Sequence, residues 1–341
     1  MVCGMRDNGF KLNLGCGRNI ASPVPDRQKH AMRICLFPIG VVATLLAMAW
    51  PSQALPRDKP GRVDLFALRN QEEMVLMVGS RLAAASVDVC SRRAPGLGIT
   101  LHDLSQYSPA YRAQARSMFE RVDLPAILAI ARDGPADRAG IRAGDGVMAV
   151  NGVPVPPEST DGLGRVELIL EQMERAAASG PVRLTLWRDG VEIKRVYAPP
   201  PACAVRFQVR PDQKLDAQTN GWLIEITTKL ADFVQGPDEL AAVLAHEMAH
   251  VILNHRSGIG RIGPRQSRAA ELEADRLGVR LAFQAGFRPE AAASFWRRMH
   301  ERGGVGPSGM GNHPADRERI RTVDAALRDL AGASERARSR P

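Results

Sequence analysis

Residues 240–255 read Leu240-Ala-Ala-Val-Leu-Ala-His-Glu-Met-Ala-His-Val-Ile-Leu-Asn-His255. Apolar residues recur through this segment at helical spacing and indicate a buried helix. His246 and His250 are four residues apart, which places them about 40° apart on one helix face, so both imidazoles can reach one metal ion. Glu247 lies beside them, where a general base for an attacking water is needed. The other interpretation is a chance occurrence in a surface helix, because the His-Glu-x-x-His motif is short.

The residues after the second histidine limit the kind of metal site. A metzincin-type continuation needs glycine at position 253 and histidine at position 256, and the chain has Leu253 and Arg256 there. The metzincin pattern is therefore excluded. On a continuous helix His255 is rotated by a net angle of about 140° from His250. We expect it to point away from the metal, as a partly exposed polar residue.

A second, acidic helix is predicted after a loop. Residues 269–278 read Ala-Ala-Glu-Leu-Glu-Ala-Asp-Arg-Leu-Gly, with Glu271 and Asp275 again four residues apart. One carboxylate can ligate the metal while the other accepts the free N–H of a ligand histidine, which fixes the imidazole tautomer. The alternative is an ordinary solvated acidic face, which is the role that we expect for Glu273.

The two motifs together resemble those of a known family. His246-Glu-Met-Ala-His250 followed by Glu271-Leu-Glu-Ala-Asp275 is similar to the pattern of gluzincin metallopeptidases of the HtpX, BepA and CAAX prenyl protease group. The resemblance covers residues 205–330. It implies one Zn²⁺ per chain held by His246, His250 and Glu271, with Glu247 as the catalytic base and Asp275 as the acceptor for a ligand-histidine N–H.

A third segment, Gly311-Asn-His-Pro-Ala-Asp-Arg-Glu-Arg-Ile320, resembles the His-Pro segment that precedes the last helix of the family. Peptide hydrolysis needs a group that steadies the oxyanion. All three tyrosines precede the peptidase region, so we expect a histidine or arginine in this role, and His313 is our candidate. The same imidazole can instead occupy the fourth position of the metal and keep the enzyme latent. His300 is expected on an exposed helix face.

The amino-terminal region has the features of a targeting segment. Residues 1–31 show no periodicity, and we assign them no fold. A short basic region from Met32 leads into an apolar run over residues 34–50, and Ser52 and Ala54 fit the small-residue cleavage rule. We predict a signal peptide over residues 32–54 and a periplasmic or otherwise exported mature chain. The alternative is a retained inner-membrane anchor through residues 34–50.

Charge and hydropathy argue against two classes of protein. The full chain carries a formal net charge of +9, and removal of residues 1–54, with six basic and two acidic side chains, leaves +5. Because no basic stripe alternates with aromatic residues, we expect no nucleic-acid partner. No apolar run after residue 54 is long enough to span a bilayer, which argues against an integral membrane protease. Membrane association is expected only through an uncleaved leader.

Cys90 and Cys203 are the two cysteines that remain after residue 54. An even count in an exported chain favours a disulfide, which would tie together the two ends of the region between them. Two buried free thiols are the alternative.

The region between the cysteines is predicted to be a β-rich module. A strand, a Gly134-Pro135 turn, a one-turn helix, a strand over residues 146–150, a helix over residues 168–177 and a hairpin around Asp189-Gly190 follow one another. This order resembles a PDZ domain of bacterial extracytoplasmic proteases. The resemblance implies a carboxylate loop at Gly96, Leu97, Gly98 and Ile99 whose backbone N–H groups face the terminal carboxylate of a peptide. Residues 105–120 are a long insertion for such a domain, and a Gly-rich turn that binds nothing is the alternative.

The expected fold class is α+β: a mainly α zinc metallopeptidase domain with a small sheet, preceded by the β-rich PDZ-like domain. Residues 222–227 alternate as a strand, and we expect this to be the edge strand that holds an extended substrate beside the metal, or else a structural strand that covers the helix. Helices are expected over residues 287–299 and 314–330. The expected ranges are 55–92 for an amino-terminal helix segment, 93–201 for the PDZ-like domain, 202–335 for the peptidase domain and 336–341 for a tail.

These observations predict a zinc-dependent endopeptidase acting on extracytoplasmic, misfolded or envelope proteins. Polypeptides are the expected partners, bound in part by their carboxyl-terminal tails at the PDZ-like domain. The alternative is a catalytically idle chaperone or peptide-binding adaptor that keeps the metalloprotease fold.

Overall fold

The computed structural model describes residues 63–255, 264–302 and 316–338. The leader, the signal peptide and His313 lie outside these ranges, so what the sequence indicates for them stays a prediction. Among the helices of the described ranges, none has the length and apolar character needed to cross a membrane.

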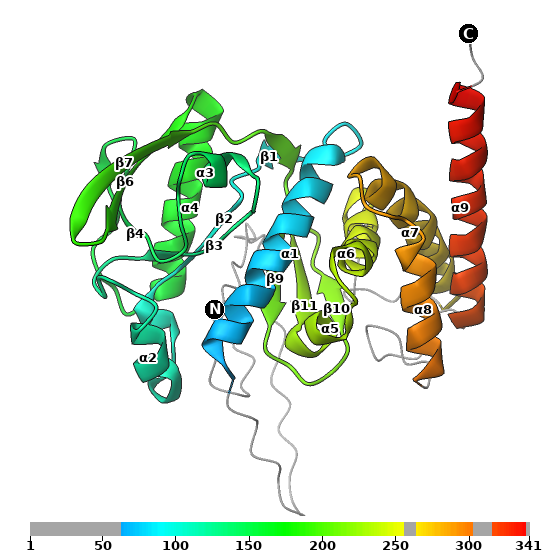
Figure 1. The fold of residues 1–341 in the computed structure, drawn as a ribbon, viewed down its shortest axis with the longest axis horizontal. Helices are drawn as coiled ribbons and strands as arrows, with labels where there is room; N and C mark the ends of the chain where they lie inside the picture. Colours follow the sequence, from blue (N-terminus) through cyan, green and yellow to red (C-terminus); the bar gives the residue numbers. More distant parts are fainter. Residues whose placement is uncertain (1–62, 256–263, 303–315, 339–341) are drawn as a thin grey trace, which may run out of the picture. The chain divides into compact units, whose positions relative to one another are not determined.

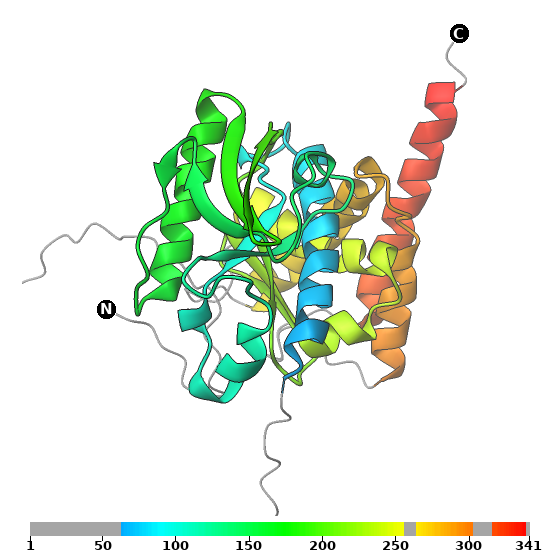
Figure 2. The same cartoon turned by 60° about the vertical axis from the view of Figure 1, so that its left-hand side comes forward.

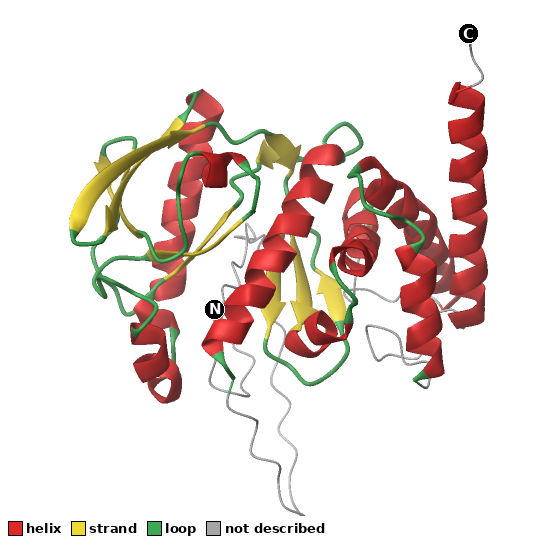
Figure 3. Ribbon diagram, viewed as in Figure 1, coloured by secondary structure: helices red, strands yellow, loops and turns green. Residues whose placement is uncertain are grey.

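The α+β class is confirmed, with a β-rich region followed by a mainly helical one (Figures 1 and 3). The first region begins with helix α1 and continues through the PDZ-like module. Its elements are α1 (Leu65–Ala85), β1 (Arg93–Pro95), β2 (Ile99–His102), a 3-10 helix (Leu104–Gln106), α2 (Pro109–Arg116), β3 (Ala126–Ile130), α3 (Pro135–Arg138), β4 (Gly146–Val150), β5 (Val153–Pro154), α4 (Gly162–Ser179), β6 (Val182–Arg188), β7 (Val191–Tyr197) and β8 (Pro201–Cys203).

The second region carries a small sheet and five helices in the described residues. Its elements are β9 (Arg206–Arg210), β10 (Ala217–Thr219), β11 (Leu223–Thr227), α5 (Thr228–Phe233), α6 (Pro237–Ile252), α7 (Pro264–Gln284), α8 (Ala291–Glu301) and α9 (Asp316–Arg338). Helix α9 packs against α7 and α8 (Figure 1).

The PDZ-like module is an antiparallel sheet in the order β2-β3-β4-β6-β7, with β5 added to β4 and helix α4 packed against it. Its own core is formed by apolar side chains of the sheet and of α4, among them Ile127, Val166 and Leu184. The predicted hairpin is present between β6 and β7, and Asp189 and Gly190 at its tip both have positive φ, as a tight two-residue turn requires. The insertion folds as the 3-10 helix and α2.

The two ends of the module are joined at its base. Strand β1 pairs with β8 in antiparallel register, with Arg93 opposite Cys203. The disulfide Cys90–Cys203 lies next to this pair, with its Cα atoms 5.6 Å apart. The predicted disulfide is therefore confirmed. The segments that enter and leave the module are joined to each other by the β1–β8 pairing and by this disulfide.

The prediction that residues 222–227 form the edge strand of the peptidase sheet is wrong. The strand order is β10-β11-β9, so β11, which contains most of the strand expected at the edge, is the central strand. Its backbone is occupied on both sides, by β10 in antiparallel and by β9 in parallel register, and it cannot receive a substrate strand. The alternating pattern of residues 222–227 identified a strand, but the strand's place in the sheet depends on partners distant in sequence.

Helix α1 belongs to the core of the peptidase region. It packs over β9 and against α6 (Figures 1 and 2), and Val75, Val78 and Leu82 are fully buried in the same core as α6. A buried Glu72 carboxylate on α1 accepts a hydrogen bond from Val209 N–H on β9 (3.0 Å). Burial raises the pKa of Glu72 to about 8. The helix is thus fixed to the sheet by both apolar and polar contacts.

Candidate metal centre

Helix α6 positions two of the candidate ligands. Gly236, with φ of 86°, precedes Pro237 in the first helical turn, where a missing N–H costs nothing. The helix is apolar almost all round, and its side chains at His246 and Glu247 are each only 7% exposed. Polar side chains buried this deeply need partners, and the neighbouring helix α7 provides them.

Helix α7 crosses α6 closely at the histidines. A Cβ at Gly278 would lie 3.1 Å from the backbone N of His246, so a larger residue would require the two helices to separate by a few tenths of an ångström. The close crossing brings Glu271 and Asp275, which are 8% and 3% exposed, against the histidine face of α6.

His246, His250 and Glu271 form a compact triangle of ligand atoms. The Nε2 atoms of the two histidines are 3.2 Å apart. Oε2 of Glu271 lies 3.3 Å from Nε2 of His246, and its other oxygen, Oε1, lies 3.5 Å from Nε2 of His250. One ligand atom from each of the three residues lies within 4.8 Å of the other two. With bonds of about 2.0–2.1 Å and tetrahedral angles, two zinc ligands lie about 3.3–3.4 Å apart. The three side chains therefore fit a zinc-sized ion, and they are the group in the described residues that can hold a metal.

Asp275 lies on the other side of the His246 ring. Its Oδ1 is 3.0 Å from His246 Nδ1, so the Nδ1–H donates to this carboxylate and leaves Nε2 directed at the triangle. This is the contact expected of the second residue in the acidic pair. It fixes the tautomer and the orientation of the ring.

Arg319 of α9 completes the site and was missed by the sequence reasoning. Its side chain donates to both oxygens of Asp275 at 2.8 and 2.6 Å, and its guanidinium stacks 3.5 Å from the centre of the Trp296 ring. Burial would raise the pKa of Asp275, but the Arg319 guanidinium and the His246 N–H hold it below its usual value. Arg319 is 1% exposed and lies four residues before Val323 on the buried stripe of its helix. A charged residue at an apolar position of the helical pattern is the signal that could have identified it.

The two imidazoles differ in their affinity for protons. Burial and Arg319 act to lower the pKa of His246, but the carboxylates of Asp275 and Glu271 outweigh them and raise it to about 9. Burial, together with the neighbouring His246, lowers the pKa of His250 to about 3. His250 is therefore neutral and ready to coordinate, whereas a metal ion competes with a proton at His246. Metal binding should then release a proton and weaken in acid.

Glu247 has the properties of a general base. Burial raises its pKa to about 7, with Glu271 and Asp216 also raising it and His246 and Arg319 opposing them. A carboxyl group with a pKa near 7 can both accept and return a proton at neutral pH.

The other histidines are placed as follows. His255 lies outside the ligand triangle, as expected, but its Nδ1 is 3.1 Å from Nδ1 of His250, so it does not simply face solvent. The reason is that α6 ends at Ile252 and the chain reverses at Asn254, with φ of 54°, so His255 is not on a continuous helix. His300 is exposed, as expected, and Glu273 is exposed as well.

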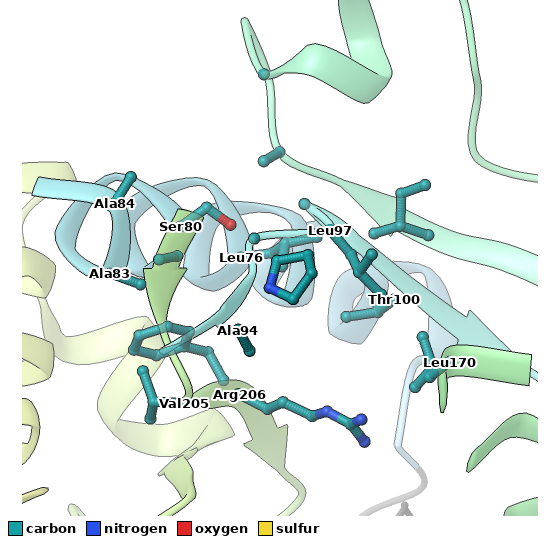
Figure 4. Close-up of a pocket in the computed structure, with 18 of the residues that line it drawn as sticks. Leu76, Ser80, Ala83, Ala84, Ala94, Leu97, Thr100, Leu170, Val205 and Arg206 are labelled. Carbon is teal, nitrogen blue, oxygen red and sulfur yellow. The ribbon is translucent and has the colours of Figure 1, made fainter. Parts of the chain in front are cut away.

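The predicted carboxylate loop lines a cavity of about 810 Å³. Figure 4 shows Leu97 and Thr100 on one side, Leu76 and Ser80 of α1 on another, and Arg206 of β9 below them. Arg206 donates to Glu167 (2.7 Å) and Glu174 (2.9 Å) of α4.

One backbone N–H group of this loop already donates a hydrogen bond within the protein. The N–H of Gly96 donates to Pro200 C=O at 2.8 Å, so this residue does not offer its N–H to a ligand. Gly98 has φ of 62°, a left-handed conformation that suits glycine. Leu97, Gly98 and Ile99 therefore remain as the candidates for contacts with a carboxylate.

Comparisons with known proteins agree with this arrangement. Residues 194–263 and 260–327 match the model of peptidase family M48, and residues 127–188 match that of the PDZ domain. The chain is 31% identical over 127 residues to the mitochondrial metalloendopeptidase OMA1 of Schizosaccharomyces pombe. That alignment covers 27% of this chain and 37% of the relative. Parts of the chain thus match a PDZ domain and an M48 peptidase domain, and these matches support a metallopeptidase. The PDZ match begins at β3 and leaves out the loop at Gly96–Ile99.

Proposed function

We propose that this protein is a zinc-dependent endopeptidase. The observation that carries the proposal is the convergence of His246, His250 and Glu271: the two Nε2 atoms are 3.2 Å apart, and each lies 3.3–3.5 Å from one of the two Glu271 oxygens. Two histidines and one carboxylate are also the donor set of catalytic zinc sites that keep a position open for water or substrate. The M48 match over the same residues supports this assignment.

The residues of the chain have separate tasks in hydrolysis. When bound, zinc would supply a Lewis acid that polarises the scissile carbonyl and acidifies water. Glu247 takes the proton of the attacking water and returns it to the leaving amine. Asp275, held by Arg319, keeps Nε2 of His246 directed at the ion. His313 remains our candidate for steadying the oxyanion or for closing the fourth position.

The substrate strand is assigned to β10. Thr227 N–H of β11 donates to Asp216 C=O (3.0 Å) at the start of this strand. Because bonding alternates along an antiparallel ladder, the peptide group of Ala217 faces away from β11. No described strand lies on that side. Helix α6, which carries Glu247, packs against β10, so this edge lies near the base. An extended polypeptide added to β10 would pass the metal site.

We infer an extracytoplasmic setting from two features. The leader resembles a signal peptide, and the Cys90–Cys203 disulfide is typical of oxidising compartments. We therefore propose misfolded or envelope proteins as substrates, with the PDZ domain binding their tails or regulating access. The HtpX and BepA group is the branch of the family that we favour.

The decisive experiment compares the wild type with Glu247→Gln on a denatured protein mixture and measures zinc in both. We expect the variant to keep zinc and to lose cleavage, while Glu171→Gln, on an exposed face of α4, cleaves as the wild type does. Equal cleavage by the wild type and Glu247→Gln would show that Glu247 is not the base. If the wild type binds peptides without cleaving them, and Glu247→Gln binds them equally, the chain is instead a peptide-binding adaptor.

A further inference from the structure

A line of polar contacts leads from the metal site to the surface through His255. Nδ1 of His250 is 3.1 Å from Nδ1 of His255, and Nε2 of His255 is 3.3 Å from a carboxylate oxygen of Glu273. The side chain of His255 is 18% exposed and that of Glu273 is 58% exposed. The mechanism proposed above does not use either residue.

The end of helix α6 holds His255 in this position. The N–H of His255 donates to His250 C=O at 2.9 Å, and the N–H of Asn254 donates to Val251 C=O at 3.2 Å. With the positive φ of Asn254, these two bonds form a Schellman motif, the common termination of a helix by a left-handed residue. The turn folds the chain back so that the imidazole of His255 lies against that of His250.

The contacts allow one consistent assignment of protons. Nε2 of His250 faces His246 and Glu271, so a neutral His250 that ligates through Nε2 carries its proton on Nδ1. That N–H can donate only if Nδ1 of His255 is unprotonated. His255 must then carry its proton on Nε2, where it meets Glu273. The opposite tautomer of His255 would place two N–H groups against each other.

We propose that His255 is a positioning residue for the metal ligand His250, with Glu273 fixing the tautomer of His255. The inference rests on the proposed function, because it requires His250 to be a ligand. It assigns each ligand histidine its own acceptor: the buried Asp275 carboxylate for His246 and a neutral imidazole for His250. Partners of this kind typically change metal affinity about 10- to 100-fold when removed.

The test measures zinc affinity by competition with a chromophoric chelator in three variants. We expect His255→Leu, which lacks an acceptor, to bind zinc about tenfold more weakly than the wild type. His255→Gln, whose amide oxygen can accept from Nδ1–H, should recover most of this loss. Asn254→Gly keeps the left-handed turn and serves as the control with wild-type affinity. Equal zinc affinity of His255→Leu and the wild type overturns the inference.

A second measurement needs no variant. Nitrogen-15 spectra of the zinc-loaded wild type should show His250 protonated at Nδ1 and His255 protonated at Nε2, and a His255 protonated at Nδ1 contradicts the proposal. These measurements distinguish a failure of the proposed protease function from a failure of the proposed role of His255. A wild type that binds zinc and shows these tautomers but cleaves nothing refutes the protease, whereas a wild type that cleaves while His255→Leu retains full zinc affinity refutes only the role of His255.

Discussion

At the scale of single residues, burial determines what the side chains of the site can do. Glu247, His246 and Asp275 are common residue types, but all three are nearly inaccessible to solvent. Burial raises the pKa of Glu247 to about 7, whereas the Arg319 ion pair keeps Asp275 charged. Two carboxyl groups in one site are thus suited to the different roles that we propose for them, one in proton transfer and one in holding a ligand.

The pH dependence of activity follows from Glu247. A base works in its ionised form, so kcat/KM should rise with pH as the pKa of Glu247 is passed. The charge of a bound metal lowers this pKa. The rise of kcat/KM on the acid side of the pH profile should therefore be centred at or below pH 7. The measurement is kcat/KM from pH 5 to 9 in saturating zinc, with zinc content checked at each point because His246 binds protons in acid. A rate independent of pH over the acid range, with zinc retained, would contradict this role.

Removal of Arg319 should leave a buried charge without its partner. We expect Arg319→Met to lower the free energy of unfolding by about 3–5 kcal/mol, because the Asp275 carboxylate would lose both hydrogen bonds from the guanidinium. The double variant Arg319→Met with Asp275→Asn should lose less, since the charge itself is gone. Urea unfolding in the presence of a chelator tests both. A double variant less stable than Arg319→Met would be evidence against this account.

At the scale of elements, the site depends on how closely α6 and α7 cross. The periodicity of the sequence predicted both helices and placed the two pairs His246 and His250, and Glu271 and Asp275, on facing surfaces. It could not show the distance between the helices, which depends on Gly278. Two other predictions failed for different reasons. Strand β11 is central because it pairs with β9 and β10 on either side, and His255 returns to His250 because the left-handed Asn254 ends the helix. Arg319 comes from a helix at the far end of the chain.

Substitution of Gly278 tests the crossing. Alanine normally favours a helix by about 0.5–1 kcal/mol, but here its Cβ would meet the His246 backbone at 3.1 Å. We expect Gly278→Ala to lower the melting temperature and to weaken zinc binding. Gly332→Ala is the control, because its Cβ would contact only the mobile end of the Arg336 side chain on α9, and it should be neutral or stabilising. Equal behaviour of the two variants would argue against a close crossing.

At the scale of the whole molecule, the PDZ-like module interrupts the peptidase region in sequence. Helix α1, which packs in the peptidase core, precedes the module, and the strands of the peptidase sheet follow it. The β1–β8 pair and the disulfide close its base. Arg206 of β9, beside the central strand, bonds to two glutamates of α4. Arg206 thus links α4 to the sheet of the peptidase region.

Loss of the disulfide should destabilise the folded chain. The two cysteines are separated by 113 residues, so the bridge removes much conformational freedom from the unfolded chain. We expect the double variant Cys90→Ser, Cys203→Ser to lose about 2–4 kcal/mol of unfolding free energy. Zinc affinity should not change, because neither cysteine belongs to the site. Urea unfolding with and without reductant measures the effect, and reductant should weaken the wild type and leave the variant unaffected.

The central claim is that three side chains hold one zinc ion. Anomalous diffraction at the zinc edge, from crystals of the protein grown with zinc, tests it directly. We expect a single strong peak about 2.0–2.2 Å from Nε2 of His246, Nε2 of His250 and one oxygen of Glu271. A peak at other residues, or no peak between these three, would contradict the assignment of the metal centre.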